Sequence, residues 1–309
     1  MMSQLFLKIG GHAVRRFPGK LLLETLSLLI LCGFAQSGWT DTLNSIKTRG
    51  SLIVGVKKDV PLWGLLDPVN GEIKGLEPDL AKLVAEQLGV KLKLIGVLTS
   101  ERTEAVVSGR VDMLIATLSD TPERRQAMTL VLPHYYASGV NLLARKSERF
   151  KDWSDLRNRR VCSRRGAFYN RPITVTYGAD VIAVYGNDLS FAALRDGRCS
   201  ALVHDDIAIV TLLQSPLWAH DFEMPLTSLY HVPWAIALAP SERGGTFEKL
   251  VSKLVVAWHR EGILEKYEAK WGVPSTTYLK EKHDIWQRKV NGKFFCGDEM
   301  SSITPVECQ

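Results

Sequence analysis

Short apolar segments alternate with longer segments of helical periodicity from residue 46 onward. Residues 51–56 and 91–97 have the composition of strands. Between them, apolar side chains recur at helical spacing over residues 79–88, and Gly89 follows as a stop signal. This alternation is typical of parallel sheets covered by helices. We therefore expect an α/β fold.

Two extended apolar segments divide this alternation into two parts. The segment at 139–145 carries the chain out of a first lobe, and the segment at 234–239 carries it back. A chain of 309 residues is long enough for two lobes. We expect each lobe to be a mostly parallel sheet flanked by helices. The predicted domains are a discontinuous first lobe at 38–141 plus 236–273, a second lobe at 142–235 and a polar C-terminal tail at 274–309.

The N-terminal residues have the pattern of an export signal. Basic residues between positions 15 and 20 precede an apolar run at 21–34, and a small-x-small cleavage pattern follows at 35–37. We therefore predict a cleaved signal peptide at 1–37. An uncleaved membrane anchor is the less favoured alternative, because the run is shorter than the ~20 residues of a membrane span and contains Glu24.

The charge of the chain gives no indication of nucleic-acid binding. Removal of residues 1–37 takes away four basic residues and one acidic residue, so the formal charge falls from +6 to +3. Lys and Arg do not form a long stripe interleaved with aromatic residues. We expect no nucleic-acid partner.

Four cysteines remain after the predicted signal peptide, which contains Cys32. An even number in an exported chain favours two disulfides. No two of them have the CxxC spacing of a zinc site and no histidine pair is near them, so we expect no metal. Cys296 and Cys308 are expected to staple the polar tail.

Hydroxyl groups and an arginine follow the apolar strand predicted at 111–116. Thr117 and Ser119 come where the strand should end, and Thr121 suits the N-cap of the next helix. Small ligands bind beyond the carboxyl ends of strands in open α/β sheets. Arg124 lies in the first turn of that helix, which is an unfavourable position for a cation unless an anion compensates it. The alternative is a solvated surface arginine with hydroxyls that serve the turn.

Six segments, taken in order and spacing, resemble one family. They are RGSLIVGVKKDVPLWGLLDPVNGEIKGLEPDLAKLVAEQLG, SGRVDMLIATLSDTPERRQAM, PHYYASGVNLLARK, SDLRNRRVCSRRG, DGRCSALVHDD and REGILEKYEAKWGV. The chain resembles family 3 of the periplasmic solute-binding proteins, the polar amino-acid class that serves ATP-driven importers. The resemblance covers about residues 46–273.

The resemblance implies a type II periplasmic binding-protein fold with two lobes joined by two crossover segments. It further implies a periplasmic monomer without a cofactor that captures an amino acid, or a similar small zwitterion or anion, between its lobes. Such a protein delivers its ligand to the membrane permease of an ABC importer and catalyses no reaction.

The resemblance also implies how a zwitterion is held. Arg124 matches the arginine of the T-x-x-R segment that binds the ligand carboxylate, and Thr117 and Ser119 match groups that contact the ligand. Asp205 matches the acceptor of the ligand ammonium. The alternative for Asp205 is a helix N-cap, with the adjacent Asp206 in the ligand role.

The second-lobe loop departs from the family pattern. Arg164 and Gly166 match ligand-binding positions, but Ala167 and Phe168 follow where a hydroxyl residue is common. The same resemblance pairs Cys162 with Cys199, close to this loop.

Two further residues match the lining of the family's ligand site. Trp63 fits an aromatic wall for the ligand side chain, with core packing as the equal alternative. His204 fits a polar lining residue. The basic residues Lys57, Arg164 and Arg165 favour an acidic or polar ligand without identifying it.

Two other functions share this fold. One is an enzyme similar to cyclohexadienyl dehydratases, and the other is a sensor or accessory protein that transports no amino acid. His204 and Asp205 are not expected to form an acid–base dyad, because neighbouring strand residues point to opposite faces. A disulfide at Cys162 excludes it as a nucleophile.

Overall fold

The structure is a computed structural model, and it describes residues 42–309. The signal peptide that we predict at 1–37 lies outside these residues. Among the helices of residues 42–309, none has the length and apolar character needed to cross a membrane.

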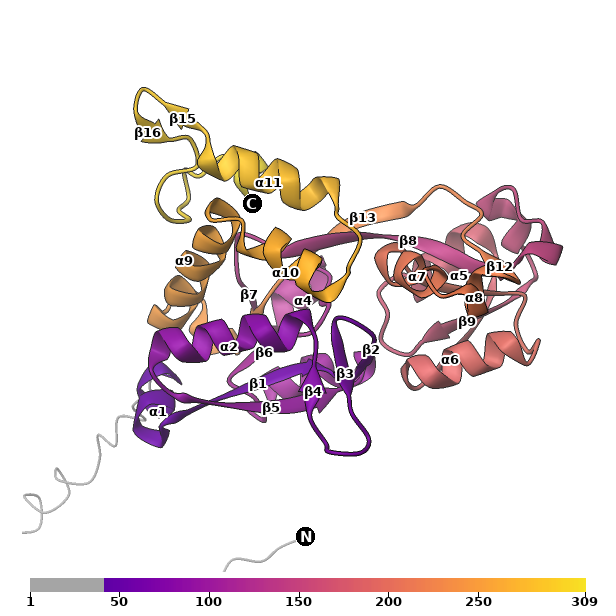
Figure 1. Ribbon diagram of the computed structural model, residues 1–309, viewed down its shortest axis with the longest axis horizontal. Helices are drawn as coiled ribbons and strands as arrows, with labels where there is room; N and C mark the ends of the chain where they lie inside the picture. The colour runs from indigo at the N-terminus through magenta and orange to yellow at the C-terminus, as the bar shows by residue number, and fades with distance from the viewer. Residues whose placement is uncertain (1–41) are drawn as a thin grey trace, which may run out of the picture. The chain divides into compact units, whose positions relative to one another are not determined.

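A five-stranded sheet with the order β5-β1-β6-β14-β7 forms the centre of the first lobe (Figure 1). Its strands are β1 (Ser51–Lys57), β5 (Lys91–Val97), β6 (Met113–Ile115), β7 (Thr129–Leu130) and β14 (Ala237–Leu238). The strands predicted at 51–56 and 91–97 are confirmed as β1 and β5, and they pair in parallel from Ser51–Lys91 to Lys57–Val97. β14 returns from far along the chain and pairs antiparallel with both β6 and β7.

Helices cover this sheet and bury its apolar side chains. They are α1 (Thr42–Arg49), α2 (Leu76–Leu88), α3 (Arg102–Val107), α4 (Pro122–Ala127), α9 (Thr246–Arg260) and α10 (Ile263–Trp271). Gly89 ends α2 in a left-handed conformation with φ of 65°, as the sequence predicts. α9 and α10 are separate helices, because Gly262 between them has φ of 66°. A small antiparallel sheet of β2 (Asp59–Val60), β3 (Gly64–Leu66) and β4 (Ile73–Lys74) follows β1.

The second lobe contains a six-stranded sheet with the order β10-β9-β11-β8-β12, and β13 also pairs with β8. Its strands are β8 (Tyr136–Arg145), β9 (Arg160–Arg164), β10 (Asp180–Val184), β11 (Ala201–Asp205), β12 (Phe222–Glu223) and β13 (Leu229–Trp234). Its helices are α5 (Asn170–Tyr177), α6 (Gly186–Arg195), α7 (Asp206–Leu213) and α8 (Pro216–Ala219). β9, β10 and β11 are parallel, whereas β8 is antiparallel to its partners. Each lobe therefore adds antiparallel strands to the predicted parallel ones, because the segments that link the lobes join the sheets in the opposite direction.

The strands β8 and β13 run side by side and lead the chain between the lobes (Figure 1). Tyr136, the first residue of β8, packs in the core of the first lobe, whereas the later residues of β8 pair with β11 of the second lobe, so the first passage lies within β8. The second passage lies within β13, because its last residue, Trp234, packs in the core of the first lobe and bridges to Ser119. The boundary that we predict after residue 141 falls inside β8, and the numbered domain limits remain a prediction.

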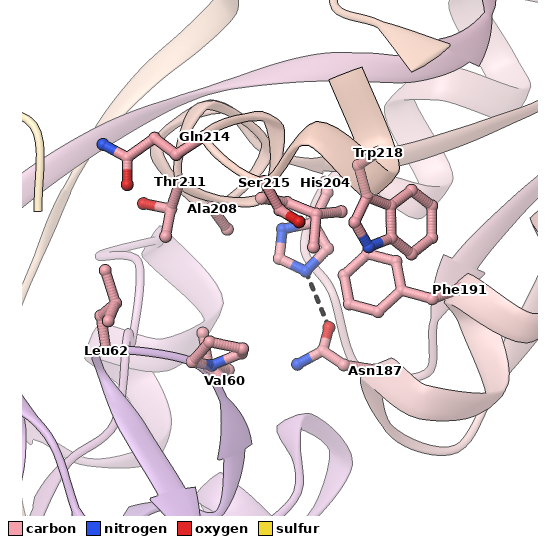
Figure 2. A pocket seen from close by; sticks show the side chains of 12 residues that line it. Val60, Leu62, Asn187, Phe191, His204, Ala208, Thr211, Gln214, Ser215 and Trp218 are labelled. Carbon is pink, nitrogen blue, oxygen red and sulfur yellow. Dashed lines mark hydrogen bonds between the residues drawn. The ribbon is translucent and has the colours of Figure 1, made fainter. Parts of the chain in front are cut away.

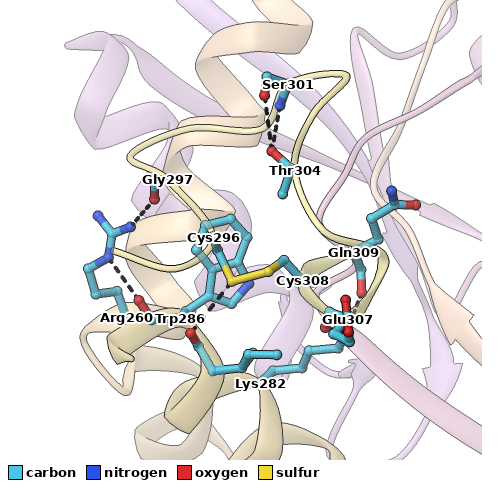
Figure 3. The surroundings of a disulfide bond; sticks show 11 residues. Arg260, Lys282, Trp286, Cys296, Gly297, Ser301, Thr304, Glu307, Cys308 and Gln309 are labelled. Atoms are coloured by element: carbon cyan, nitrogen blue, oxygen red, sulfur yellow. Dashed lines mark hydrogen bonds between the residues drawn. A yellow bond between two sulfur atoms is a disulfide. The ribbon is translucent and has the colours of Figure 1, made fainter. Parts of the chain in front are cut away.

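The C-terminal tail forms a small core of its own against α9. It contains α11 (Thr277–Gln287) and the hairpin of β15 (Lys289–Val290) and β16 (Lys293–Phe294). The predicted Cys296–Cys308 disulfide is present, with 5.8 Å between the Cα atoms (Figure 3). These cysteines pack with the fully buried Trp286 and with Val256 of α9. The tail therefore buries more apolar surface than its polar composition suggests.

Candidate functional site

The backbone of Thr117, just after β6, is held from both sides. Its N–H donates to Glu77 Oε1 at 2.6 Å, and its carbonyl accepts from Arg102 Nη1 at 2.5 Å. Tyr135 donates to the same Glu77 oxygen at 2.6 Å, and Arg102 also binds the carbonyl of Thr99. Thr117 has φ of 47°, an uncommon conformation for a β-branched residue that these bonds stabilise.

Arg124 lies where α4 begins beside this segment. Thr121 caps α4 by accepting from the Arg124 N–H at 3.4 Å, as predicted. The Arg124 guanidinium donates to the carbonyl of Ser119 at 2.6 Å and to the carbonyl of Gly166 at 3.3 Å. Gly166 belongs to the second lobe, so Arg124 links the two lobes. Burial lowers the pKa of Arg124, and Asp205 nearby opposes that shift.

Gly166 approaches the first lobe closely. Its φ is 82°, and a Cβ atom there would lie 2.8 Å from the Cα of Ser100. A side chain at this position would therefore both strain the loop and collide with main chain of the other lobe.

Arg164 and Asp205 meet at the ends of neighbouring strands β9 and β11. Arg164 Nη2 lies 2.5 Å from Asp205 Oδ2 and 2.7 Å from the hydroxyl oxygen of Tyr169. Both charged side chains are buried. Burial opposes the charge on Arg164, but Tyr169 and Asp205 raise its pKa above the usual value. This ion pair is not visible in the sequence, because 41 positions separate its members.

The neighbouring carboxylates of Asp205 and Asp206 make different contacts. Asp205 occupies the N-cap position of α7, but its side chain makes no capping hydrogen bond. Asp206 instead accepts from the Ser138 hydroxyl at 2.7 Å and the Gly139 N–H at 3.0 Å, both in β8. Asp206 therefore braces β8, whereas Asp205 faces the arginine.

A second link between the lobes joins β2 to α6. Asp59 Oδ2 accepts from the N–H of Asn187 at 2.9 Å, and the Asn187 side chain donates to the carbonyl of Asp59 at 2.7 Å. Lys57 lies 2.8 Å from the other Asp59 oxygen and donates to Thr99 Oγ1 at 3.0 Å. His204 Nε2 completes the chain at 2.8 Å from Asn187 Oδ1.

His204 is held as a buried neutral ring. Burial and the nearby Arg164 lower its pKa well below the usual value. Its Nδ1 lies 3.6 Å from Asp205 Oδ2, which is closer than strand alternation predicts but beyond hydrogen-bond distance. Asp205 ends its strand, so the alternation no longer separates the two side chains.

Trp63 lies in the core of the first lobe. Its ring packs edge-on against Tyr136 and Trp234, with centroid distances of 4.6 and 4.8 Å. The side chain is fully buried. These contacts are those of core packing, which was the alternative to an aromatic wall for the ligand.

Several buried polar atoms of the cluster have no hydrogen-bond partner within residues 42–309. They include Thr117 Oγ1, Arg164 Nε and His204 Nδ1. Leaving such groups unpaired costs about 1–3 kcal/mol each. Thr117 Oγ1 and Arg164 Nε are therefore unused donors of the kind that a carboxylate accepts from, whereas Nδ1 of the neutral His204 is an acceptor, because its Nε2 donates to Asn187 Oδ1.

Two cavities border the cluster. One, of about 790 Å³, is lined by Arg124, Asp120 and Phe168. The other, of about 480 Å³, has His204 and Asn187 on one side and apolar walls from Val60, Phe191 and Trp218 (Figure 2). The second cavity receives residues from both lobes, so its size depends on how the lobes meet.

The disulfide that the resemblance implies is present between Cys162 in β9 and Cys199 before β11. The Cα atoms are 5.6 Å apart. The bond joins the strand that ends at Arg164 to the segment that leads into the strand ending at Asp205.

Sequence reasoning missed Glu77, Arg102, Tyr135 and Asp59 as parts of this cluster. For two of these residues, Glu77 and Arg102, the sequence contained a signal of burial. Glu77 stands beside apolar residues on the buried side of α2, and Arg102 follows Thr99 by one helical turn. Charged residues in such positions need buried partners.

A family model of bacterial extracellular solute-binding proteins, family 3, matches residues 52–274. The chain is 31% identical to a glutamine-binding protein of Geobacillus stearothermophilus over 55% of this chain and 66% of that relative. It is 23% identical to the L-cystine-binding protein TcyJ of Escherichia coli over 81% of this chain and 94% of that relative.

Solved structures share the fold. The solute receptor for L-cysteine of Neisseria gonorrhoeae is 25% identical with a TM-score of 0.69, over 75% of this chain and 94% of that chain. An ancestral amino-acid-binding protein, a precursor of cyclohexadienyl dehydratase, is 23% identical with a TM-score of 0.64, over 74% of this chain and 99% of that chain. The second likeness concerns the fold alone.

Proposed function

The chain belongs to family 3 of the bacterial extracellular solute-binding proteins, and on that premise we propose that it captures an amino acid between its lobes and delivers it to an ABC importer. The relatives named for glutamine and L-cystine binding support an amino acid as the ligand. The observation that carries the proposal is the buried cluster at the lobe interface, with Arg124 on one side and Asp205 on the other.

The ligand carboxylate binds to Arg124 and Thr117. A guanidinium offers a carboxylate two parallel hydrogen bonds, which are stronger in a site shielded from water. The buried Thr117 hydroxyl lacks a partner within residues 42–309 and supplies a further donor. Ser119 holds the arginine through its main chain, since its carbonyl accepts from Arg124.

The ligand ammonium binds to Asp205. Arg164 already donates to one Asp205 oxygen. A carboxylate accepts several hydrogen bonds, so Asp205 can receive an ammonium while it keeps the arginine. The two lobes then hold opposite ends of one zwitterion.

Ligand binding favours the arrangement in which the lobes touch. The links from Arg124 to Gly166 and from Asn187 to Asp59 form only when the lobes meet. A ligand that contacts both lobes shifts the population towards this state. The permease recognises that state, and the protein acts as a monomer in the periplasm.

The experiment is a thermal-shift screen of residues 38–309 against the amino acids, followed by calorimetry. A tight ligand raises the melting temperature by mass action. Arg124→Ala is expected to weaken binding at least 100-fold with the fold retained. The matched control is Arg125→Ala, which removes the next residue of α4, an arginine paired with Asp120 on the surface.

Two outcomes would overturn the proposal. One is an unchanged melting temperature with every amino acid. The other is turnover of prephenate or arogenate, which would make the chain an enzyme of the same fold.

A further inference from the structure

The polar cluster at the lobe interface holds more cations than anions. The cluster cations are Lys57, Arg102, Arg124 and Arg164, and the cluster acids are Asp59 and Asp205. Lys57 is fully buried, and Arg102 and Arg164 are 4% and 2% exposed. The ion pairs of the cluster join Lys57 to Asp59 and Arg164 to Asp205. Two cations therefore remain without a carboxylate of the cluster.

Asp120 and Glu123 also attract Arg124, but Asp120 pairs with Arg125 and Glu123 is exposed, and the remaining titratable groups do not offset the surplus. Burial raises the pKa of Glu77 to about 8, despite hydrogen bonds from Tyr135 and Thr117, so this carboxyl group is mostly uncharged at pH 7. Arg102 is held by the carbonyls of Thr99, Ala116 and Thr117, which carry no formal charge. His204 is neutral and supplies no anion.

The surplus positive charge contributes to lowered pKa values inside the cluster. The pKa of Lys57 is lowered to about 8, chiefly by burial and also by Arg102 and Arg164, while Asp59 opposes the shift. The pKa of Arg102 is lowered to about 9, chiefly by burial and also by Arg124 and Arg164, while Asp205 opposes the shift. Both side chains still carry a proton at pH 7. A zwitterionic ligand brings no net charge and leaves the surplus in place.

Arg164 and Lys57 carry donors that a second carboxylate could use. Arg164 Nε is buried without a partner within residues 42–309. Thr99 Oγ1 lies 3.0 Å from Lys57 Nζ and 3.5 Å from Arg164 Nη1, so one hydroxyl oxygen serves two cations. An additional anion beside Lys57 and Arg164 would supply the missing acceptor.

We infer that the ligand is an acidic amino acid, with its second carboxylate held by Arg164 and Lys57. This inference rests on the proposed function, because it assigns the first carboxylate to Arg124 and the ammonium to Asp205. Asp205 requires the ammonium, so a dicarboxylate without an amino group binds more weakly.

Calorimetry with pairs of similar shape tests the inference. The probes are L-glutamate against L-glutamine, L-aspartate against L-asparagine, and glutarate without the ammonium. The better acid is expected to bind at least 10-fold more tightly than its amide and than glutarate. An amide, or any neutral or cationic amino acid, that binds as tightly as the acids overturns the inference and leaves the proposed function intact. Glutarate bound as tightly as L-glutamate overturns the assignment of the ammonium, and binding of no probe overturns the acidic-ligand inference while the thermal-shift screen with all amino acids decides the proposed function.

A substitution tests where the second ligand carboxylate binds, independently of the first. Lys57→Gln is expected to reduce the preference for the acid over its amide about 10-fold, measured as the ratio of the two affinities in the same variant. Lys58→Gln is the matched control, because Lys58 is the partly exposed neighbour in sequence. An unchanged preference in Lys57→Gln overturns the assignment of Lys57. If that variant does not fold, Arg164→Lys replaces it and is expected to reduce the same preference, since lysine lacks the Nε donor.

Discussion

The two lobes prepare their halves of the site in different ways. The first lobe fixes main chain: Glu77 and Arg102 hold the N–H and carbonyl of Thr117. The second lobe fixes side chains: Arg164 and Asp205 hold each other by charge. Hydrogen bonds to a backbone remain in place when a ligand arrives, whereas a charge pair must share its atoms with the ligand. We therefore expect the first lobe to form the rigid wall of the proposed site and the second lobe to adjust when a ligand binds.

The largest effect should be on the free energy of unfolding, when the buried carboxyl group of either lobe, Asp205 or Glu77, is replaced by its amide. Asp205→Asn is expected to lower the free energy of unfolding by about 3 kcal/mol, because Arg164 loses its buried counter-ion. Glu77→Gln should cost about 1 kcal/mol or less, because glutamine keeps an oxygen for Thr117 and Tyr135 and Glu77 is mostly uncharged at pH 7. Urea denaturation at pH 7 measures both. Equal losses would show that the lobes do not differ in this way.

A smaller effect, on ligand affinity, is expected from a substitution where the lobes touch. Gly166→Ala should weaken ligand affinity about 10-fold, because the new methyl group would collide with Ser100 of the first lobe. Gly197→Ala is the matched control. Gly197 also has a left-handed conformation, with φ of 70°, but an added Cβ there meets no atom within 4 Å. Both variants should lose about 1 kcal/mol of stability from backbone strain. Loss of affinity in both, or in neither, would contradict a contact between lobes at Gly166.

The smallest effect should appear in the pH dependence of binding. The pKa of Lys57 is about 8, and Lys57 faces Asp59, Arg102 and Arg164. An acidic ligand favours the protonated lysine, so binding takes up a proton and affinity falls as the pH rises through 8. We expect a threefold to 10-fold loss in affinity for the acid between pH 7 and 9, which corresponds to about 0.7–1.4 kcal/mol. Calorimetry at pH 7, 8 and 9 measures it, and a slope that persists in Lys57→Gln would assign the proton to another group.

Local patterns in the sequence predicted the regular parts of the fold. The strands β1 and β5, the stop of α2 at Gly89 and the Thr121 cap all depend on neighbouring residues, and each was predicted. The break at Gly262 is hard to predict from the sequence, because apolar periodicity continues on both sides of it.

The charged cluster could be predicted only in part. Resemblance singled out Arg124, Asp205 and Arg164, and the structure brings them to one region. It could not pair Arg164 with Asp205, nor add Glu77 and Arg102, because those contacts depend on how distant strands and helices pack. For Trp63, in contrast, the resemblance suggested a ligand contact that the packing does not favour. Its sequence position fitted a wall of the ligand site, but its neighbours Tyr136 and Trp234 come from distant strands and enclose it in the core.

The hydrogen bond from Arg124 ends on a main-chain carbonyl, that of Gly166. Every amino acid carries the same carbonyl, so the link does not depend on which side chains the loop presents. The hydroxyl residue that is missing after Gly166 is replaced here by Ala167, and the link persists. The loop can therefore accumulate substitutions at position 167 over evolutionary time without losing this contact, whereas Gly166 itself has almost no freedom to change.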